Sequence, residues 1–543
     1  MKSKMNTISM KILILSSVFL LFCTLISSQP GYIDYNTATQ NITRLSKEYS
    51  SICTVRSLVK TIGGKDIVVL TIGTGDKDNK PGIAVVGGTE GNYILGKNLA
   101  AGFAESLLKE SSSPEISELL GRITFYVFPD VTPDATEFYF SGLKYEKTVN
   151  NRSTDDDKDF LFDEDPYEDL DKDGVITLIR ITDPSGKYTN FIDDQRIMVE
   201  ADLSKGEKGG YLVYSEGIDN DHDGSFNEDG PGGVNFNRNF TFNYEEFGKN
   251  AGLHPVSEPE TKAVADFLYE RFNIYSVFTF GPGDNIGEPY KYSDGGDTGR
   301  RITSIRKTDE PVNKIVSERY HEITGATGAP FSVTVPGSFS DWAYFHYGRY
   351  SFSTPGWWFP AEKGKNKEAE FLKYAEKKGL KDVFVPWTEI KHPDFPGKKV
   401  EVGGIKPFLT TNPPADTLPD LVEKTYRFIK AIAFMHPELE FLDIETEAAG
   451  ENIFRITLKV HNKGIFATCA EIGKDNMWTR IMRISLEPAG GQDILSGQKV
   501  RRLERLEGGS SEELSWLISG KGKVKITAGA LNTGTITTTV DLK

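Results

Sequence analysis

Carboxylates at every second position are the residues of this chain whose spacing points most directly to chemistry. Asp169, Asp171 and Asp173 alternate and are followed by Gly174, which matches the first positions of a calcium-binding loop. In such loops the alternate carboxylates point inward and the glycine permits a sharp turn. The twelfth position is Arg180 instead of a bidentate Glu, so the sequence does not predict a complete EF-hand.

The alternating spacing occurs in two further runs, which gives three acidic loops. Residues 155–173 contain eleven acids and two lysines, and so many carboxylates repel one another unless cations neutralise them. The sequence therefore predicts calcium ions that rigidify long loops, and the alternative is a solvated acidic surface. The candidate ligands are Asp155, Asp157, Asp159, Asp163, Asp169, Asp171, Asp173, Asp219, Asp221 and Asp223.

Strand-like and helix-like segments alternate from about residue 30 to residue 435. β-branched and aromatic runs predict strands, and apolar residues at helical spacing predict helices. This order predicts an α/β domain with a mixed, largely parallel sheet flanked by helices. The predicted strands include 67–72, 82–86, 123–128 and 274–280, and the predicted helices cover about 94–109, 257–272 and 419–435.

The pattern changes after Pro437, where short alternating runs are separated by Gly and Asn turns. These runs predict a small all-β sandwich in residues 437–543, and the alternative is an extra layer on the first domain. The first domain then covers residues 29–436, with the acidic loops in an insert of about 150–230.

The N-terminus has the layout of a secretory signal. Three lysines precede the apolar run 12–22, and the small residues Ser27 and Ser28 follow it. Residues 1–28 are therefore predicted to be a signal peptide, which makes the mature protein secreted or periplasmic. The alternative is a membrane anchor. No second apolar run is long enough to cross a bilayer, so no membrane span is expected after cleavage.

Composition limits the classes of partner. The formal net charge of −15 disfavours nucleic acid, while 38% hydrophobic residues support a sizeable core. Cys53 and Cys469, the cysteines left after cleavage, do not form a disulfide scaffold. The oligomeric state remains open.

Several motifs, in order along the chain, resemble those of the zinc carboxypeptidase family. Together they indicate a carboxypeptidase A-like fold and resemble a secreted bacterial subgroup with an acidic insert and a C-terminal β-sandwich. The motifs are Val85 to Tyr93, Phe128 to Asp134, Gly233 to Phe240, Ser257 to Thr261, and Gly337 to Tyr344 with Tyr350 to Phe352.

The resemblance implies a zinc ion held by His, Glu and a distant His, with a further Glu as general base. In this chain those positions correspond to Glu90, Tyr93, Gly281 and Pro355. None of the seven histidines has a carboxylate three residues later, so no substitute His-x-x-Glu pair exists. The sequence therefore predicts loss of zinc and of ordinary carboxypeptidase catalysis.

Some ligand-binding positions of the resemblance remain. Asn237 and Arg238 correspond to the pair that grips a free C-terminal carboxylate, and Trp357 and Trp358 are candidates to line the same cleft. The leading hypothesis is a protein that binds a peptide or peptidoglycan-like ligand through its carboxylate. The alternatives are that Arg238 pairs with Glu90 and that the two Trp are core residues.

Two rival functions stay open. One is an active metallocarboxypeptidase or hydrolase with a rebuilt metal site. The other is a calcium-stabilised surface interaction protein, in which the acidic loops and the β-sandwich carry the interaction.

Overall fold

The computed structural model describes most of the chain. The described residues are 31–155, 160, 162–163, 165–220, 222, 224, 232–297, 301–332, 335–362, 364–474 and 476–543. The predicted signal peptide and the candidate calcium ligands Asp157, Asp159, Asp221 and Asp223 lie outside the described residues.

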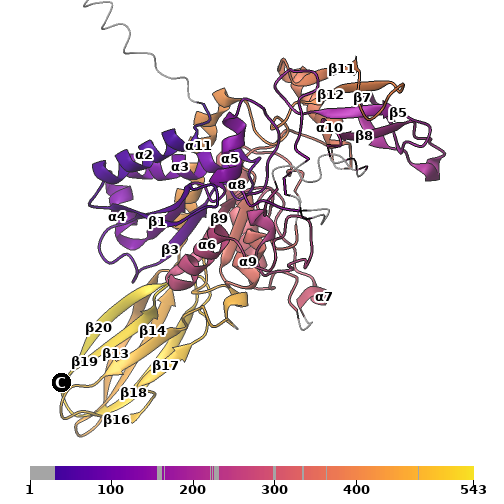
Figure 1. Cartoon of the computed structure of the whole chain (residues 1–543). Coiled ribbons are helices and arrows are strands. Elements are labelled where there is room, and N and C mark those ends of the chain that lie inside the picture. The colour runs from indigo at the N-terminus through magenta and orange to yellow at the C-terminus, as the bar shows by residue number, and fades with distance from the viewer. Residues whose placement is uncertain are drawn as a thin grey trace, which may run out of the picture.

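A six-stranded mixed sheet forms the centre of the first domain (Figure 1). The strand order is β1-β2-β4-β3-β9-β10, in which β4, β3, β9 and β10 are parallel and the β1–β2 and β2–β4 pairs are antiparallel. The four parallel strands are buried along their whole length, as expected for strands covered on both faces. The bounds are β1 Cys53–Lys60, β2 Asp66–Ile72, β3 Gly82–Val86, β4 Thr124–Phe128, β9 Ile274–Phe280 and β10 Tyr350–Thr354.

Helices cover both faces of this sheet, which confirms the predicted α/β architecture. Ile83 and Val85 of β3 pack into one apolar cluster and Ala84 and Val86 into the other, because successive side chains of a strand point to opposite faces. One face is covered by α2 Tyr35–Glu48, α3 Ile94–Lys109, α4 Pro114–Arg122, α8 Glu310–Thr324 and α11 Leu418–Ala433, and the other by α6 Pro259–Glu270 and α9 Phe339–Phe345.

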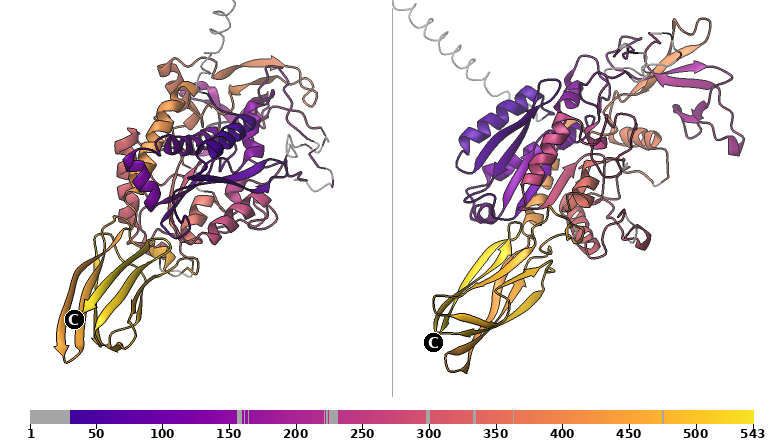
Figure 2. Two further views of the ribbon diagram at one scale, coloured as in Figure 1. Left: turned by 90° about the vertical axis from the view of Figure 1, so that its left-hand side faces the viewer. Right: turned by 60° about the horizontal axis from the view of Figure 1, so that its bottom comes forward.

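A second six-stranded sheet lies at one end of the molecule (Figures 1 and 2). Its order is β11-β12-β5-β8-β6-β7, so β5 of the insert pairs with β12, a strand more than two hundred residues later. Helix α10, Lys367–Lys378, packs beside it. The strands are β5 Leu178–Thr182, β6 Tyr188–Phe191, β7 Asp194–Glu200, β8 Tyr211–Ser215, β11 Phe384–Ile390 and β12 Val400–Ile405.

The C-terminal region consists of two four-stranded antiparallel sheets, as predicted. Their apolar side chains, such as Ile456, Trp516 and Ile526, share one buried cluster between the sheets. The first sheet contains β13 Leu439–Gly450, β14 Ile453–Asn462, β18 Ser511–Ser519 and β16 Asp493–Ser496; the second contains β17 Val500–Leu503, β15 Met482–Glu487, β19 Gly522–Ala530 and β20 Gly534–Leu542.

Short helical turns complete the described chain. They are α5 Pro133–Thr136, η1 Glu137–Phe140, η2 Leu203–Lys205, η3 Phe236–Arg238, α7 Asp294–Asp297, η4 Ala415–Thr417 and η5 Glu471–Gly473. Within the described ranges no helix has both the length and the apolar character that a bilayer crossing requires. Cys53 and Cys469 are both buried free thiols.

Candidate functional site

The carboxyl ends of β3, β9 and β10 meet at one edge of the central sheet. Val86 lies opposite Thr279, and Phe280 lies opposite Thr354. The loops that follow these strands therefore start side by side, which is where α/β sheets place their ligands. Because Glu90, Gly281 and Pro355 follow the three strands, these positions start from the same edge.

Gly281 has no room for a side chain because Thr89 packs against it. A Cβ atom added at Gly281 would lie 2.1 Å from the Thr89 hydroxyl oxygen. That hydroxyl donates a hydrogen bond of 3.2 Å to the carbonyl oxygen of Phe280, so it is held in place. The space through which a side chain at position 281 would project is therefore already filled.

Glu90 is the one carboxylate among the four family positions. Its Oε1 accepts a hydrogen bond of 2.5 Å from the Asn235 side-chain amide. Burial raises the pKa of Glu90 to about 7, against the opposing influence of Asn235, Arg238 and Asn237. At neutral pH this carboxyl group is therefore a mixture of its protonated and ionised forms.

Tyr93 and Pro355 complete the four positions. Tyr93 is the N-cap residue of α3, and burial raises the pKa of its phenol, with the charges of Glu90 and Glu146 adding to the effect. Pro355 is buried directly after β10 and has neither a backbone N–H nor a proton-accepting side chain. These positions offer one carboxylate and one neutral phenol, and no imidazole.

The segment of Asn237 and Arg238 forms η3 against this edge. The Asn235 side chain accepts a hydrogen bond from the Asn237 backbone N–H, at 2.7 Å, and the Asn237 Oδ1 accepts one from the Phe339 N–H, at 3.0 Å. Asn237 is buried, while Arg238 is half-buried. No described residue forms an ion pair with the Arg238 guanidinium, although it lies close enough to Glu90 to lower that group's pKa.

Trp357 and Trp358 have different surroundings. The Trp358 indole donates to the Thr327 carbonyl oxygen, at 3.0 Å, and stacks on Tyr320 of α8. Trp357 contacts Tyr374 of α10 and lines a separate cavity that is described below. The two indoles are both partly buried but have different contact partners.

Two of the predicted calcium ligands, Asp169 and Asp171, lie close to Glu216, an acid that was not among the predicted ligands. Oxygen atoms of Asp169, Asp171 and Glu216 all lie within 4.8 Å of one another. Glu216 is fully buried after β8 and accepts hydrogen bonds from the N–H groups of Leu170, at 2.7 Å, and Thr177, at 3.0 Å. Burial raises the pKa of Glu216, and burial together with neighbouring carboxylates raises that of Asp171.

The other four described candidate calcium ligands each accept a backbone hydrogen bond. Asp173 accepts from the Val175 N–H, Asp219 from the Gly224 N–H, and Asp155 from the Phe160 N–H. Asp163 accepts from the N–H of Gly232. None of the four belongs to the Asp169–Asp171–Glu216 cluster within the described part of the chain. No sequence signal identified Glu216, because it follows a strand more than forty residues away.

Two family models match this chain. A model of the zinc carboxypeptidase family matches residues 38–355, and a model of a domain of unknown function matches residues 438–541. Carboxypeptidase D of Homo sapiens and of Rattus norvegicus are each 24% identical to this chain over 185 residues, or 33% of this chain. The chain spans only 12% and 13% of the length of these two relatives.

The comparison with solved structures gave weaker likenesses, among them the following two. Thrombin activatable fibrinolysis inhibitor is 13% identical with a TM-score of 0.44, and 75% of each chain is covered. Carboxypeptidase A from Helicoverpa armigera is 14% identical with a TM-score of 0.42, covering 75% of this chain and 74% of that one. Because the family match extends over more than half of its residues, this chain belongs to the zinc carboxypeptidase family.

Proposed function

We propose that this protein binds the free carboxylate of a peptide or peptidoglycan-like ligand at the family's old catalytic edge and has lost zinc-dependent hydrolysis. The observation that supports this most is the composition of that edge. Glu90, Tyr93, Gly281 and Pro355 stand at the metal and base positions, whereas Asn237 and Arg238 remain.

The donor set does not suit zinc. Structural and catalytic zinc sites use three or four imidazole, thiolate or carboxylate ligands, and the four positions supply a single carboxylate. The Thr89 hydroxyl occupies the space that a histidine at position 281 would need. Without such an ion a water molecule keeps a pKa near 15.7 instead of about 7, and Pro355 provides no base to activate it.

Arg238 supplies the chemistry for carboxylate binding. Its guanidinium presents a planar fork of donors that matches two carboxylate oxygens. Since no described residue forms an ion pair with it, the guanidinium can accept a ligand anion without first losing a protein partner. The buried Asn237 lies beside it in η3, and its side-chain amide interacts with Glu90.

Calorimetry with matched peptides tests the proposal. A short peptide with a free C-terminus should bind, and the same peptide with an amidated C-terminus should bind roughly tenfold more weakly or worse. Arg238→Lys keeps the charge but removes the planar fork of donors. This variant should therefore bind the two peptides with more nearly equal affinity. Equal binding of both peptides by the unmodified protein would refute carboxylate capture.

The rival is an active hydrolase with a rebuilt metal site. Metal analysis of the purified protein separates the two. Stoichiometric zinc together with chelator-sensitive peptide cleavage would establish the rival, and metal-free protein that still binds the peptide supports the proposal.

The Asp169–Asp171–Glu216 cluster favours a second, structural role for calcium. Its oxygen donors are the kind that calcium prefers, and the position between the insert loops and β8 would tie them together. In this candidate function the insert is a calcium-stabilised interaction surface on a secreted or periplasmic protein. N-terminal sequencing of the mature protein tests the export part, with Gln29 as the expected first residue.

A further inference from the structure

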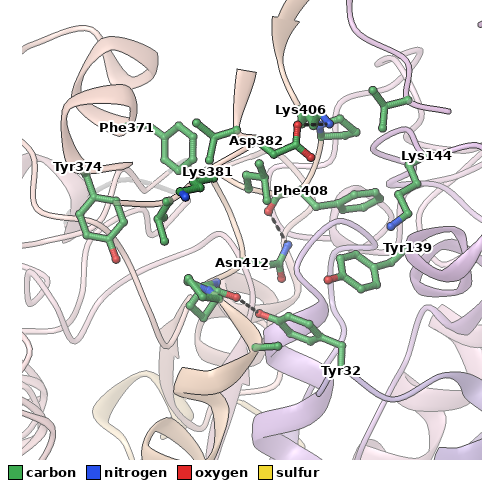
Figure 3. Close-up of a pocket in the computed structure, with 18 of the residues that line it drawn as sticks. Tyr32, Tyr139, Lys144, Phe371, Tyr374, Lys381, Asp382, Lys406, Phe408 and Asn412 are labelled. Atoms are coloured by element: carbon green, nitrogen blue, oxygen red, sulfur yellow. Dashed lines mark hydrogen bonds and ion pairs between the residues drawn. The ribbon is translucent and has the colours of Figure 1, made fainter. Parts of the chain in front are cut away.

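A cavity of about 410 Å³ lies between the central sheet domain and the second sheet, and neither Glu90 nor Arg238 lines it (Figure 3). Only three of its lining residues, Tyr139, Lys144 and Val175, fall within the region that the family model matches. The remaining lining residues come from the segment before α2 and from residues 357–415. The cavity is therefore largely built from parts of the chain outside the family match.

Two groups of aromatic side chains form its walls. On one side the rings of Tyr32 and Phe408 each contact Tyr139 edge to face, with centroids 5.2 Å apart in both pairs. Figure 3 shows Tyr374 and Phe371 on the opposite side. Flat, rigid side chains of this kind offer a large contact area at low entropic cost, so the walls suit a ligand with a flat apolar face.

Three lysines surround the same space, although the whole chain carries a formal net charge of −15. The ammonium group of Lys406 pairs with Asp382, at 2.7 Å. Lys144 and Lys381 form no ion pair with any residue in the described ranges, and the Lys144 ammonium lies 5.6 Å from the centre of the Tyr139 ring. The cavity therefore has an excess of two positive charges over its single acid.

Hydrogen bonds, one of them fully buried, hold the loop of Asn412 and Pro413 at the cavity. The Asn412 side chain accepts from the Leu95 N–H at the start of α3, at 3.0 Å, and donates to the Asn92 carbonyl oxygen, at 2.7 Å. The Tyr32 hydroxyl donates to the Pro413 carbonyl oxygen, at 2.7 Å. A preformed volume of this size is in the range of small-molecule sites.

We infer that this cavity binds a small carboxylate whose ring has a flat apolar face, held between the two aromatic walls by Lys144 and Lys381. Two sources share this chemistry: a sugar acid, whose ring C–H face stacks on aromatic side chains, and an aromatic acid. Its lining residues do not include Asn237 or Arg238, so variants can test the two sites independently.

Calorimetry with two matched pairs tests the inference: glucuronate against methyl glucoside, and benzoate against benzyl alcohol. At least one acid should bind, and its neutral partner should bind roughly tenfold more weakly or worse. Binding of glucuronate would identify the ligand class as a sugar acid, and binding of benzoate would identify it as an aromatic acid. If neither acid binds with a dissociation constant below about 10 mM, or if acid and neutral partner bind equally, the inference is wrong.

Variants separate this site from the proposed function. The double variant Lys144→Ala/Lys381→Ala should weaken acid binding roughly tenfold, whereas Lys521→Ala in the C-terminal region should leave it unchanged. The Arg238→Lys variant should bind the small acid normally, and the double-lysine variant should bind the free peptide normally. Unchanged acid binding by a folded double-lysine variant would also overturn the inference.

Discussion

The hydroxyl oxygen of Thr89 blocks the path of a side chain at Gly281, the residue directly after strand β9: a Cβ atom there would be 2.1 Å away. Thr89 directly precedes Glu90, and Gly281 is the position that corresponds to the family's distant histidine. Packing therefore fills the space that a side chain at position 281 would need, so introducing one there takes more than one substitution.

This packing predicts the cost of a side chain at position 281. Gly281→Ala should lower the free energy of unfolding by about 1–3 kcal/mol, because the threonine is held by its bond to the Phe280 carbonyl and cannot easily yield. Denaturant unfolding measures the loss. In the double variant Gly281→Ala/Thr89→Ala the clashing oxygen is gone and stability should partly recover; no recovery would contradict the assignment.

Peptide binding should weaken as the pH rises from 6 to 8. The pKa of Glu90 is about 7, so this carboxyl is mostly neutral at pH 6 and mostly ionised at pH 8. Its negative charge beside Arg238 competes with the ligand carboxylate, which predicts a roughly three- to tenfold loss of affinity. The phenol of Tyr93 stays neutral here because its pKa is raised. Calorimetry at both pH values should show the loss, and Glu90→Gln should remove it.

The buried Glu260 makes stability depend on pH. Burial raises its pKa to about 7, although the Asn150 amide donates to it at 2.7 Å. A raised folded-state pKa gives stability that is present below the unfolded value near 4.5 and is lost as the pH rises through 7. Glu260→Gln should therefore unfold less easily than the unmodified protein at pH 8, by about 1–3 kcal/mol, and little differently at pH 5.

The matched control for this prediction is Glu270→Gln, an exposed glutamate at the end of the same helix. Its unfolding profile should follow that of the unmodified protein at both pH values. If Glu260→Gln shows the same difference at pH 5 and pH 8, the effect is not one of ionisation.

Calcium should raise the melting temperature through the Asp169–Asp171–Glu216 cluster. A site that binds only the folded chain adds about 2.7 kcal/mol when calcium is at 100 times its dissociation constant. Glu216→Gln should abolish most of the shift, while Glu200→Gln, an exposed acid at the end of β7, should keep it. Thermal melts of both variants with calcium and with chelator measure these shifts. If the unmodified protein melts at the same temperature in both, the cluster does not bind calcium.

A buried ion pair joins the C-terminal sheets to the first domain. The Arg505 guanidinium lies 3.3 Å from Asp309 and 2.7 Å from Glu471, and the side chains of Arg505 and Asp309 are only 5% and 1% exposed. Arg505→Met should lower the free energy of unfolding by about 3–5 kcal/mol, because Asp309 would remain buried without its cationic partner. Limited proteolysis should then release the C-terminal region. Arg502→Met, on the exposed part of β17, should not, and adding Asp309→Asn to Arg505→Met should restore part of the stability.

The fold could be predicted well from local patterns. Continuous apolar runs such as Gly82–Val86 and Ile274–Phe280 indicated buried parallel strands, and the alternating runs after Pro437 indicated two-faced antiparallel ones. Helix 94–109 has the bounds that its spacing predicted, while the helix expected over about 257–272 is shorter, Pro259–Glu270, because proline at its start and Arg271 as its C-cap limit it.

Sequence alone determined the residue types at each family position, because identity at a position does not depend on contacts. Only the tertiary structure showed that Thr89 fills the space at Gly281, that Glu216 joins Asp169 and Asp171, and that residues 178–215 and 384–405 share one sheet. Each of these is a contact between segments far apart in the chain. Periodicity reports which face of an element is apolar, but the register and crossing of distant elements decide which side chains meet.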